Sequence, residues 1–267
     1  MKIMYEKEKG RLVYAGKSPS PDFWDSHWDL ADLRASIERD KNNSFVLKVL
    51  KKYIPDKKGR ILEGGCGQGQ VVYCMHAHGY ESVGIDFAEK AVSRTRALFP
   101  DLDVRTGDVR DLPFPDDYFT GYWSLGVIEH FPEGYDAILK EMKRVLANGG
   151  FLFLGFPYMS FLRKLKARLG LYQPFTGGKI ADFYQYVLDE GAVTRELESY
   201  GFKLVEKRPY SGLKGFKDEV AAFRPLGQKL FDYGGKNLWM RGLRYVFDIA
   251  LAFFAGHMIL LVLRNTK

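Results

Sequence analysis

The sequence has few of the features that mark secreted, fibrous or disordered proteins. Its 267 residues contain two cysteines, Cys66 and Cys74, which are too few for a disulfide framework. No apolar run of the kind found in secretory leaders follows the first residues. Hydrophobic residues at 46% and charged residues at 27% exclude disordered, collagen-like and coiled-coil chains. The composition therefore predicts a globular protein with a large core in a reducing, cytoplasmic compartment.

The positive charge of the chain is unevenly distributed. The net charge of +7 divides into +4 over residues 1–59, −5 over residues 60–156 and +8 over residues 157–267. A uniformly basic nucleic-acid-binding protein would not have an acidic middle, so nucleic acid is disfavoured as a partner. The basic flanks predict that the molecule or surface they meet is anionic.

Short apolar runs alternate with helical patterns from Arg60 onward, as in βαβ units around a parallel sheet. Strands are expected at residues 60–63, 82–86, 103–106, 119–124, 150–156, 202–207 and 257–263. Helices are expected at residues 69–78, 88–99, 133–146 and 187–200. The predicted fold class is α/β, with a Rossmann-like seven-stranded, mostly parallel sheet and helices on both faces.

Three stretches lie outside this alternation. The first is an N-terminal segment with a helix over residues 44–53, which we interpret as covering the site. Residues 157–179 interrupt the chain after the fifth strand, and a long connection precedes the last strand; such excess length is typical of a cap. The expected divisions are an N-terminal helical segment (1–59), the core (60–210), a cap insertion (211–255) and the final strand of the core (256–267).

A glycine turn follows the first predicted strand and opens a helix. Gly65, Gly67 and Gly69 are spaced so that backbone can approach a ligand. Gln70 stands where a dinucleotide-binding fingerprint has glycine, and no Gly-Lys-Ser/Thr follows, which excludes a P-loop. Glu63 would repel a pyrophosphate but attract an ammonium or sulfonium centre. The turn therefore favours a cationic ligand.

Acidic residues also end the next two predicted strands. Asp86 lies 21 residues beyond Gly65, where a carboxylate can accept both ribose hydroxyls, and Phe87 can lie against a base. Asp108 ends the third strand and could accept an adenine amino hydrogen, with the Val109 backbone beside it. Open α/β sheets bind ligands at these carboxyl ends, so the acidic side chains predict one site.

The sequence here resembles the class I S-adenosylmethionine-dependent methyltransferases, especially the small-molecule group that includes quinone-biosynthesis enzymes. The matching segments are ILEGGCGQG (61–69), VGIDF (83–87), TGDVRDLPFPDDYFTGYWSLGVIEHF (106–131) and LKEMKRVLANGGFLFLGFP (139–157). The resemblance implies S-adenosylmethionine as cofactor, with the methionine part on Glu63 and the turn, the ribose on Asp86, and the adenine on Asp108 and Val109. The full set of expected cofactor contacts is Glu63, Gly65, Cys66, Gly67, Gly69, Asp86, Phe87, Asp108, Val109 and Ser124.

Catalytic residues are harder to identify, because methyl transfer needs mainly alignment and a base only where the acceptor loses a proton. Glu129 and His130 follow the fourth strand and are the candidates. Alternatively, Glu129 braces the next helix and His130 packs beneath the cofactor. Tyr184 and Tyr186 are candidates for substrate contacts or for core packing. The Asn/Asp-Pro-Pro-Tyr/Phe segment that would resemble amino-group methyltransferases is absent, which disfavours an exocyclic amine in nucleic acid as acceptor. No metal site is expected.

Two apolar segments raise the question of membrane contact. Phe161, Leu165 and Leu169 form the apolar stripe of a short basic helix, which suits either a lid or an anionic membrane surface. The apolar run from Val246 to Leu263 contains a Gly-His break and is interpreted as a helix followed by a strand rather than a span. Peripheral membrane contact stays open.

The sequence thus predicts a methyltransferase acting on a small or lipid-like, anionic acceptor, with oxygen favoured as the acceptor atom. The alternatives are an RNA methyltransferase and a non-catalytic S-adenosylmethionine-binding regulatory protein. The oligomeric state is left open. The cations expected to face the acceptor are those of the short basic helix: Arg163, Lys164, Lys166 and Arg168.

Overall fold

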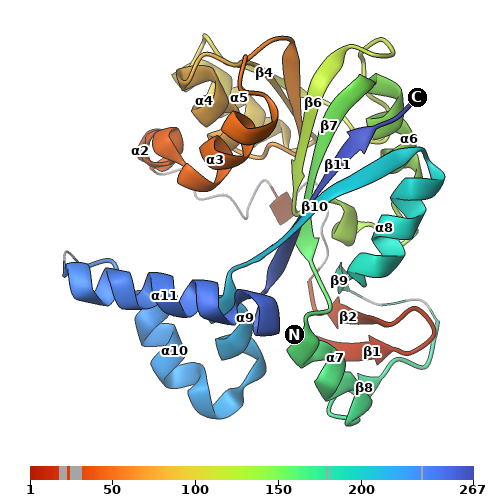
Figure 1. The fold of residues 1–267 in the computed structure, drawn as a ribbon, viewed down its shortest axis with the longest axis vertical. Helices are drawn as coiled ribbons and strands as arrows, with labels where there is room; N and C mark the ends of the chain where they lie inside the picture. Colours follow the sequence, from red (N-terminus) through yellow and green to blue (C-terminus); the bar gives the residue numbers. More distant parts are fainter. Residues whose placement is uncertain (18–22, 25–31, 179, 181, 236) are drawn as a thin grey trace. The chain divides into compact units, whose positions relative to one another are not determined.

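The chain forms two compact units, each assembled from distant parts of the sequence (Figure 1). The structure is a computed structural model that describes residues 1–17, 23–24, 32–178, 180, 182–235 and 237–267. Unit 1 comprises Met1–Lys17, Gly155–Arg195 and Glu206–Leu261, and unit 2 comprises Ser18–Leu154, Glu196–Val205 and Val262–Lys267. These boundaries differ from the sequence-based division, because residues 155–195 group with the first 17 residues.

A seven-stranded sheet contains every strand expected from the alternating pattern, which confirms the predicted fold class. Its order is β10-β11-β7-β6-β3-β4-β5, and β3 pairs in parallel with both β4 and β6. The β4–β5 pair is also parallel. The strands are β3 (Arg60–Gly64), β4 (Glu81–Asp86), β5 (Asp103–Thr106), β6 (Phe119–Leu125), β7 (Leu146–Pro157), β10 (Phe202–Tyr210) and β11 (Met258–Asn265).

The helices of unit 2 follow from apolar stripes and end signals in the sequence. The predicted helix at residues 44–53 is confirmed, and Asn43 begins it by accepting the N–H groups of Phe45 and Val46. In Figure 1, α4 lies on one side of the sheet and α6 on the other. The helices are α2 (Leu33–Arg39), η1 (Asp40–Asn42), α3 (Ser44–Tyr53), α4 (Gln70–Ala77), α5 (Glu89–Leu98), η2 (Ile128–His130) and α6 (Asp136–Val145), while α8 (Glu190–Ser199) begins in unit 1.

Unit 1 contains a four-stranded sheet that the sequence interpretation missed. The order is β8-β1-β2-β9, formed by β1 (Lys2–Glu6), β2 (Arg11–Ala15), β8 (Gln173–Pro174) and β9 (Phe183–Val187). The expectation of a helical segment is therefore wrong for residues 2–15, which form an antiparallel hairpin. Leu12 and Val13 are fully buried in β2, which pairs with β9. The apolar, β-branched and aromatic residues of β2 favour a strand, although the turn of the hairpin is charged.

Unit 1 also contains several helices. They are α7 (Phe161–Arg168), α9 (Gly212–Glu219), η3 (Ala221–Phe223), α10 (Arg224–Phe231) and α11 (Leu238–Ala255). The break expected near Gly256 is confirmed, because α11 ends at Ala255 and β11 begins at Met258. Within the described ranges, no helix combines the length and the hydropathy that crossing a membrane requires.

Candidate functional site

The glycine turn connects β3 to α4 in unit 2. Gly65, Gly67 and Gly69 all have positive φ, at 77°, 52° and 77°. A Cβ on Gly65 would lie 2.3 Å from Cγ2 of Val127, so no larger residue fits there without a shift. The N–H of Gly65 donates to the carbonyl of Ile85 at 2.8 Å, which fixes the turn against the end of β4.

Asp86 ends β4 and lies buried beside this turn. Its Oδ2 accepts the N–H of Gly67 at 2.7 Å, and its Oδ1 accepts the N–H of Ala88 at 2.8 Å. These two bonds orient the carboxylate. Phe87 is half-buried directly after it. The predicted association of the turn with Asp86 is therefore a direct contact.

Glu63 is buried one residue before the end of β3. Its Oε2 accepts the N–H of Val72, in the first turn of α4, at 3.1 Å. Burial raises the pKa of Glu63 well above its usual value, and the neighbouring Asp86 raises it further against the opposing hydrogen bond from Val72. A cationic ligand near this carboxyl would reverse that shift by favouring the ionised form.

Asp108 follows β5 and is held by a neighbouring cation. The guanidinium Nη2 of Arg110 donates to Asp108 Oδ2 at 2.6 Å and lowers the pKa of Asp108 through that hydrogen bond. Nη1 of Arg110 also contacts Glu133 at 3.2 Å. Val109 beside them is buried. Any donor that approaches Asp108 therefore shares this carboxylate with Arg110.

Two other predicted contacts lie in different surroundings. Cys66 packs in an apolar cluster with Val72, and burial raises the pKa of its thiol well above the usual value, so only the backbone of Cys66 is suited to meet a ligand. Ser124 lies near the end of β6, and its Oγ is buried with no hydrogen-bond partner among the described residues. The same holds for the Tyr122 hydroxyl and the Trp123 indole nitrogen.

Glu129 and His130 lie on η2, directly after β6 and the Gly126 turn. Glu129 is buried, its Oε2 has no hydrogen-bond partner in the part of the chain that the structure describes, and burial raises its pKa to about 8. The His130 ring lies 5.0 Å from the Trp24 ring, in edge-to-face geometry. Trp24 belongs to the aromatic run at residues 23–28 of the N-terminal segment, and His27 of that run lies outside the described residues.

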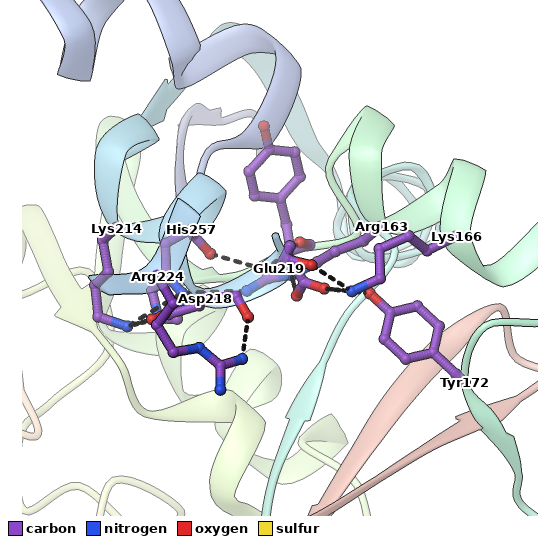
Figure 2. A network of polar contacts seen from close by, with 9 residues as sticks. Arg163, Lys166, Tyr172, Lys214, Asp218, Glu219, Arg224 and His257 are labelled. Carbon is purple, nitrogen blue, oxygen red and sulfur yellow. Dashed lines mark hydrogen bonds and ion pairs between the residues drawn. The ribbon is translucent and has the colours of Figure 1, made fainter. Parts of the chain in front are cut away.

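A second polar cluster lies in unit 1, around Glu219 at the end of α9 (Figure 2). Glu219 accepts from Arg163 Nε at 2.9 Å, Lys166 Nζ at 2.6 Å and the Tyr172 hydroxyl at 2.6 Å. Burial would raise the pKa of Glu219, but these partners outweigh it and lower the pKa. Burial, followed by the charge of Arg163, lowers the pKa of His257 to about 2, so its imidazole is neutral.

This cluster corrects the expectation that the cations of α7 face an anionic acceptor. Arg163 is fully buried and paired with Glu219, as is half-buried Lys166. Lys164 Nζ lies 2.9 Å from Asp189 Oδ2. The expectation is wrong for these three residues, because acids from other elements already neutralise them. Arg168 is exposed.

An open groove of about 920 Å³ borders the cluster. Its charged lining residues are Lys2, Lys166, Asp218, Glu219 and Arg224. With both signs present in the lining, the groove favours neither an anion nor a cation, and we assign it no ligand. Among the described residues, no group of three His, Cys, Asp or Glu side chains is arranged to hold a metal ion.

Comparison with known proteins identifies the domain around the glycine turn. A family described as "Methyltransferase domain" matches residues 62–154, which hold the turn, Asp86, Asp108 and η2. Residues 62–154 form a class I S-adenosylmethionine-dependent methyltransferase domain. S-adenosylmethionine is the cofactor of this methyltransferase domain, as the resemblance implied.

Curated relatives match about half of this chain. A 27-O-demethylrifamycin SV methyltransferase from Amycolatopsis mediterranei is 36% identical over 48% of this chain and 48% of its own length. A probable S-adenosylmethionine-dependent methyltransferase from Mycolicibacterium smegmatis is 27% identical over 54% of this chain and 52% of its own. The chain thus spans about half the length of these curated relatives.

Solved structures share the fold over most of the chain. A protein from Pyrococcus horikoshii superposes with a TM-score of 0.55 at 21% identity, covering 88% of this chain and 94% of its own. The [4+2]-cyclase SpnF superposes with a TM-score of 0.54 at 18% identity, covering 94% of this chain and 98% of its own. At these identities the likeness shows the fold alone.

The structure gathers most of the sequence-predicted site residues in unit 2 but not all candidates. Tyr184 and Tyr186, the candidates for substrate contacts or core packing, lie on strand β9 of unit 1. The Tyr122 hydroxyl and the Trp123 indole nitrogen, which lack a hydrogen-bond partner among the described residues, were not singled out from the sequence. Only alternation along β6 could have indicated them, and it does not distinguish core from site.

Proposed function

We propose that this chain transfers the methyl group of S-adenosylmethionine to a small or lipid-like acceptor. Three relatives of the methyltransferase domain support this acceptor class by their names: the rifamycin methyltransferase, a phosphatidylethanolamine N-methyltransferase from Cereibacter sphaeroides and a 24-methylenesterol C-methyltransferase from Oryza sativa. Those names differ in the acceptor atom, so the relatives do not choose among oxygen, nitrogen and carbon.

The observation that carries the proposal is the contact between the glycine turn and Asp86. The Gly67 N–H orients one oxygen of a carboxylate, a group that can accept two ribose hydroxyls. We assign Glu63 and the turn to the methionine part, Asp86 and Phe87 to the ribose and base, and Asp108 with Val109 to the adenine. Ser124 supports the assignment, because its buried hydroxyl needs a partner.

The charge at the turn suits this cofactor. Buried Glu63 has no ion pair with a described residue, and a sulfonium or ammonium centre would supply the missing positive charge. A phosphate-bearing ligand would instead add charge of the same sign as Glu63 and Asp86. The donor set therefore fits S-adenosylmethionine better than a dinucleotide.

Proton transfer is the step for which this chain has candidate side chains. Bound S-adenosylmethionine supplies an electrophilic methyl group with a good leaving group, and alignment of the acceptor contributes up to about 7–11 kcal/mol. A hydroxyl acceptor must also lose its proton. The pKa of Glu129, at about 8, lies close to neutral pH, where a general base is most effective, and His130 is its neighbour. We therefore favour oxygen as the acceptor atom.

Calorimetry with S-adenosylhomocysteine tests the cofactor site. The wild type should bind, and Asp86→Ala should lose at least tenfold in affinity because the ribose acceptor is removed. Asp103→Ala is the matched control, since Asp103 pairs with Arg105 in an exposed position on β5. Absence of binding by the wild type, or equal affinity of the Asp86 and Asp103 variants, would contradict the assignment.

A screen that measures S-adenosylhomocysteine release from candidate acceptors tests the activity. Hydroxylated lipids and small acids should be consumed, and the rate should depend on pH with an inflection that Glu129→Gln removes. The fold also occurs in a [4+2]-cyclase, so cofactor binding without release on any acceptor would favour a non-catalytic or non-methylating role. Release on RNA alone would favour the RNA methyltransferase alternative.

A further inference from the structure

Helix α11 in unit 1 leaves most of its apolar surface exposed. It buries only Ala252 and Ala255 of its 18 residues, whereas Trp239 is 88% exposed and Phe253 is 76% exposed. The other large exposed apolar and aromatic residues on α11 are Leu238, Leu243, Tyr245, Val246, Phe247, Ile249 and Phe254. Proteins rarely expose so many contiguous apolar side chains unless something binds them.

Close packing on α9 fixes which side of α11 faces outward. A Cβ on Gly215 of α9 would lie 1.8 Å from the Ala255 carbonyl, so the two backbones meet with no side chain between them. Asp248 Oδ1 accepts the N–H of Leu213 at 3.1 Å on the same side. Trp239, Val246 and Phe253 are spaced seven residues apart and therefore share a face. That face is directed away from α9.

The exposed face of α11 continues onto α7. The Phe161 and Phe254 rings lie 5.6 Å apart, and Phe161 is 59% exposed. Leu165 and Leu169 extend the same apolar stripe and are also exposed. We call this continuous area the α7–α11 surface; its residues are Phe161, Leu165, Leu169, Trp239, Leu243, Val246, Phe253 and Phe254.

The charges around the α7–α11 surface have one predominant sign. Helices α7, α10 and α11 contain one acid, Asp248, which is engaged at α9, and eight Lys and Arg. Three of these cations, Arg163, Lys164 and Lys166, are paired with Glu219 or Asp189, and the other five form no ion pair with a described residue. Unit 1 as a whole carries 20 Lys and Arg against 10 Asp and Glu, a net charge of +10. Arg168 and Arg241 are exposed and form no ion pair with a described residue, so they are free to meet an external anion.

We propose that the α7–α11 surface docks on a bilayer that contains anionic lipids. Exposed tryptophan and phenylalanine side chains enter the headgroup region, and flanking arginines meet lipid phosphates. A second copy of the chain is the less suitable occupant, because pairing would bring two units of charge +10 together. The proposal goes beyond the proposed function, since it concerns unit 1 and requires no methyl transfer.

Vesicle flotation of the full chain tests this docking. The wild type should float with vesicles of phosphatidylglycerol and phosphatidylcholine in equal parts, and weakly with phosphatidylcholine alone. Binding should fall as salt rises from about 0.05 M to about 0.5 M. The double variant Trp239→Ser/Phe253→Ser should lose at least tenfold in lipid affinity, and Arg168→Gln/Arg241→Gln should lose several-fold on anionic vesicles only.

Matched variants in unit 2 separate docking from general effects. Val205→Ser removes an apolar residue that is 47% exposed on β10, and Arg94→Gln removes an exposed cation on α5; both should float like the wild type. Retained S-adenosylhomocysteine binding and an unchanged melting temperature show that a variant is folded. The proposal is overturned if the wild type does not float, if the Val205 control loses as much, or if light scattering shows a dimer that Trp239→Ser/Phe253→Ser dissociates.

Discussion

The two units of the chain handle buried charge in opposite ways. In unit 1, Arg163 is fully buried, and Glu219 neutralises it at 2.9 Å while also accepting from Lys166. In unit 2, the buried carboxyl groups of Glu63 and Glu129 form no ion pair with any described residue. Their pKa values are raised by burial, whereas the pKa of Glu219 is lowered by its partners.

The difference shows which unit is electrostatically complete without a ligand. Unit 1, with a net charge of +10, pairs the buried guanidinium of Arg163 with Glu219. Unit 2 carries 20 basic and 23 acidic residues, a net charge of −3, with buried acids around the glycine turn. A cationic cofactor would supply the positive charge that the buried acids of unit 2 lack, whereas the buried ion pair of unit 1 stabilises the fold of that unit.

The largest expected effect comes from breaking the buried pair in unit 1. Glu219→Gln leaves the guanidinium of Arg163 buried without a counter-charge, which should lower the free energy of unfolding by about 3–5 kcal/mol. Urea unfolding followed by circular dichroism measures this loss.

Glu81→Gln is the control for this prediction, because Glu81 pairs with Arg60 but is 58% exposed. That variant should change the free energy of unfolding by under about 1 kcal/mol. Equal effects of the two variants would show that burial does not distinguish the pairs, and the contrast between the units would be lost.

The second prediction concerns Glu129 in unit 2, where replacing the buried carboxyl should raise stability at high pH instead of lowering it. Its folded pKa of about 8 lies above the ordinary value of 4.5, so its contribution to stability is complete below pH 4.5 and is lost as pH rises through 8. Glu129→Gln should therefore be more stable than the wild type at pH 9, by several kcal/mol, since each pKa unit of this shift corresponds to about 1.4 kcal/mol. Thermal unfolding at pH 5 and pH 9 measures the difference.

Glu133→Gln provides the comparison for Glu129, because Glu133 is 58% exposed and pairs with the guanidinium of Arg110 at the surface. Its stability difference from the wild type should be the same at both pH values. A Glu129→Gln variant with equally pH-independent behaviour would mean that the carboxyl of Glu129 is already ionised in the folded chain.

Much of unit 2 could be predicted from the sequence because its signals are local. Most strands contain a short apolar run, and the turns at the site are marked by glycine or an acidic residue. The stretch from Gly65 to Asp86 contains one helix and the strand after it. The cofactor candidates follow strand ends, and the fold brings strand ends together. Asp86 and Gly67 therefore meet as expected.

Unit 1 could not be predicted in the same way, because its contacts join distant segments. β2 pairs with β9 across about 170 residues of chain, and Arg163 meets Glu219 across 56. A basic amphipathic helix has the same pattern whether its cations meet lipid or buried acids. Nothing near α7 in the sequence indicates Glu219, so only the tertiary fold distinguishes Arg163 from Arg168.

The third prediction sharpens the contrast at the cofactor site. The pKa of Glu63 is raised well above its usual value, and a bound cation would lower it, so binding of S-adenosylmethionine should release a proton and strengthen as pH rises. Calorimetry in phosphate and Tris buffers, which differ in ionisation enthalpy, counts the protons released.

Glu63→Gln should abolish this proton release and weaken binding about tenfold, which corresponds to about 1.4 kcal/mol. Glu89→Gln is the control, because Glu89 is exposed at the start of α5 and its replacement leaves the glycine turn intact. If Glu63→Gln releases as many protons as the wild type, the proton comes from another group and Glu63 is already ionised.

The smallest effects should come from half-exposed ion pairs, and here the two units should behave alike. Lys164 in unit 1 is 38% exposed beside Asp189, and Arg110 in unit 2 is 45% exposed beside Asp108. Water screens both pairs, so Lys164→Gln and Arg110→Gln should each cost under about 1 kcal/mol, and high salt should reduce either loss. Urea unfolding at low and high salt measures both. If only one of the two variants lost several kcal/mol of unfolding free energy, the units would differ in their surface ion pairs as well as in their buried charges.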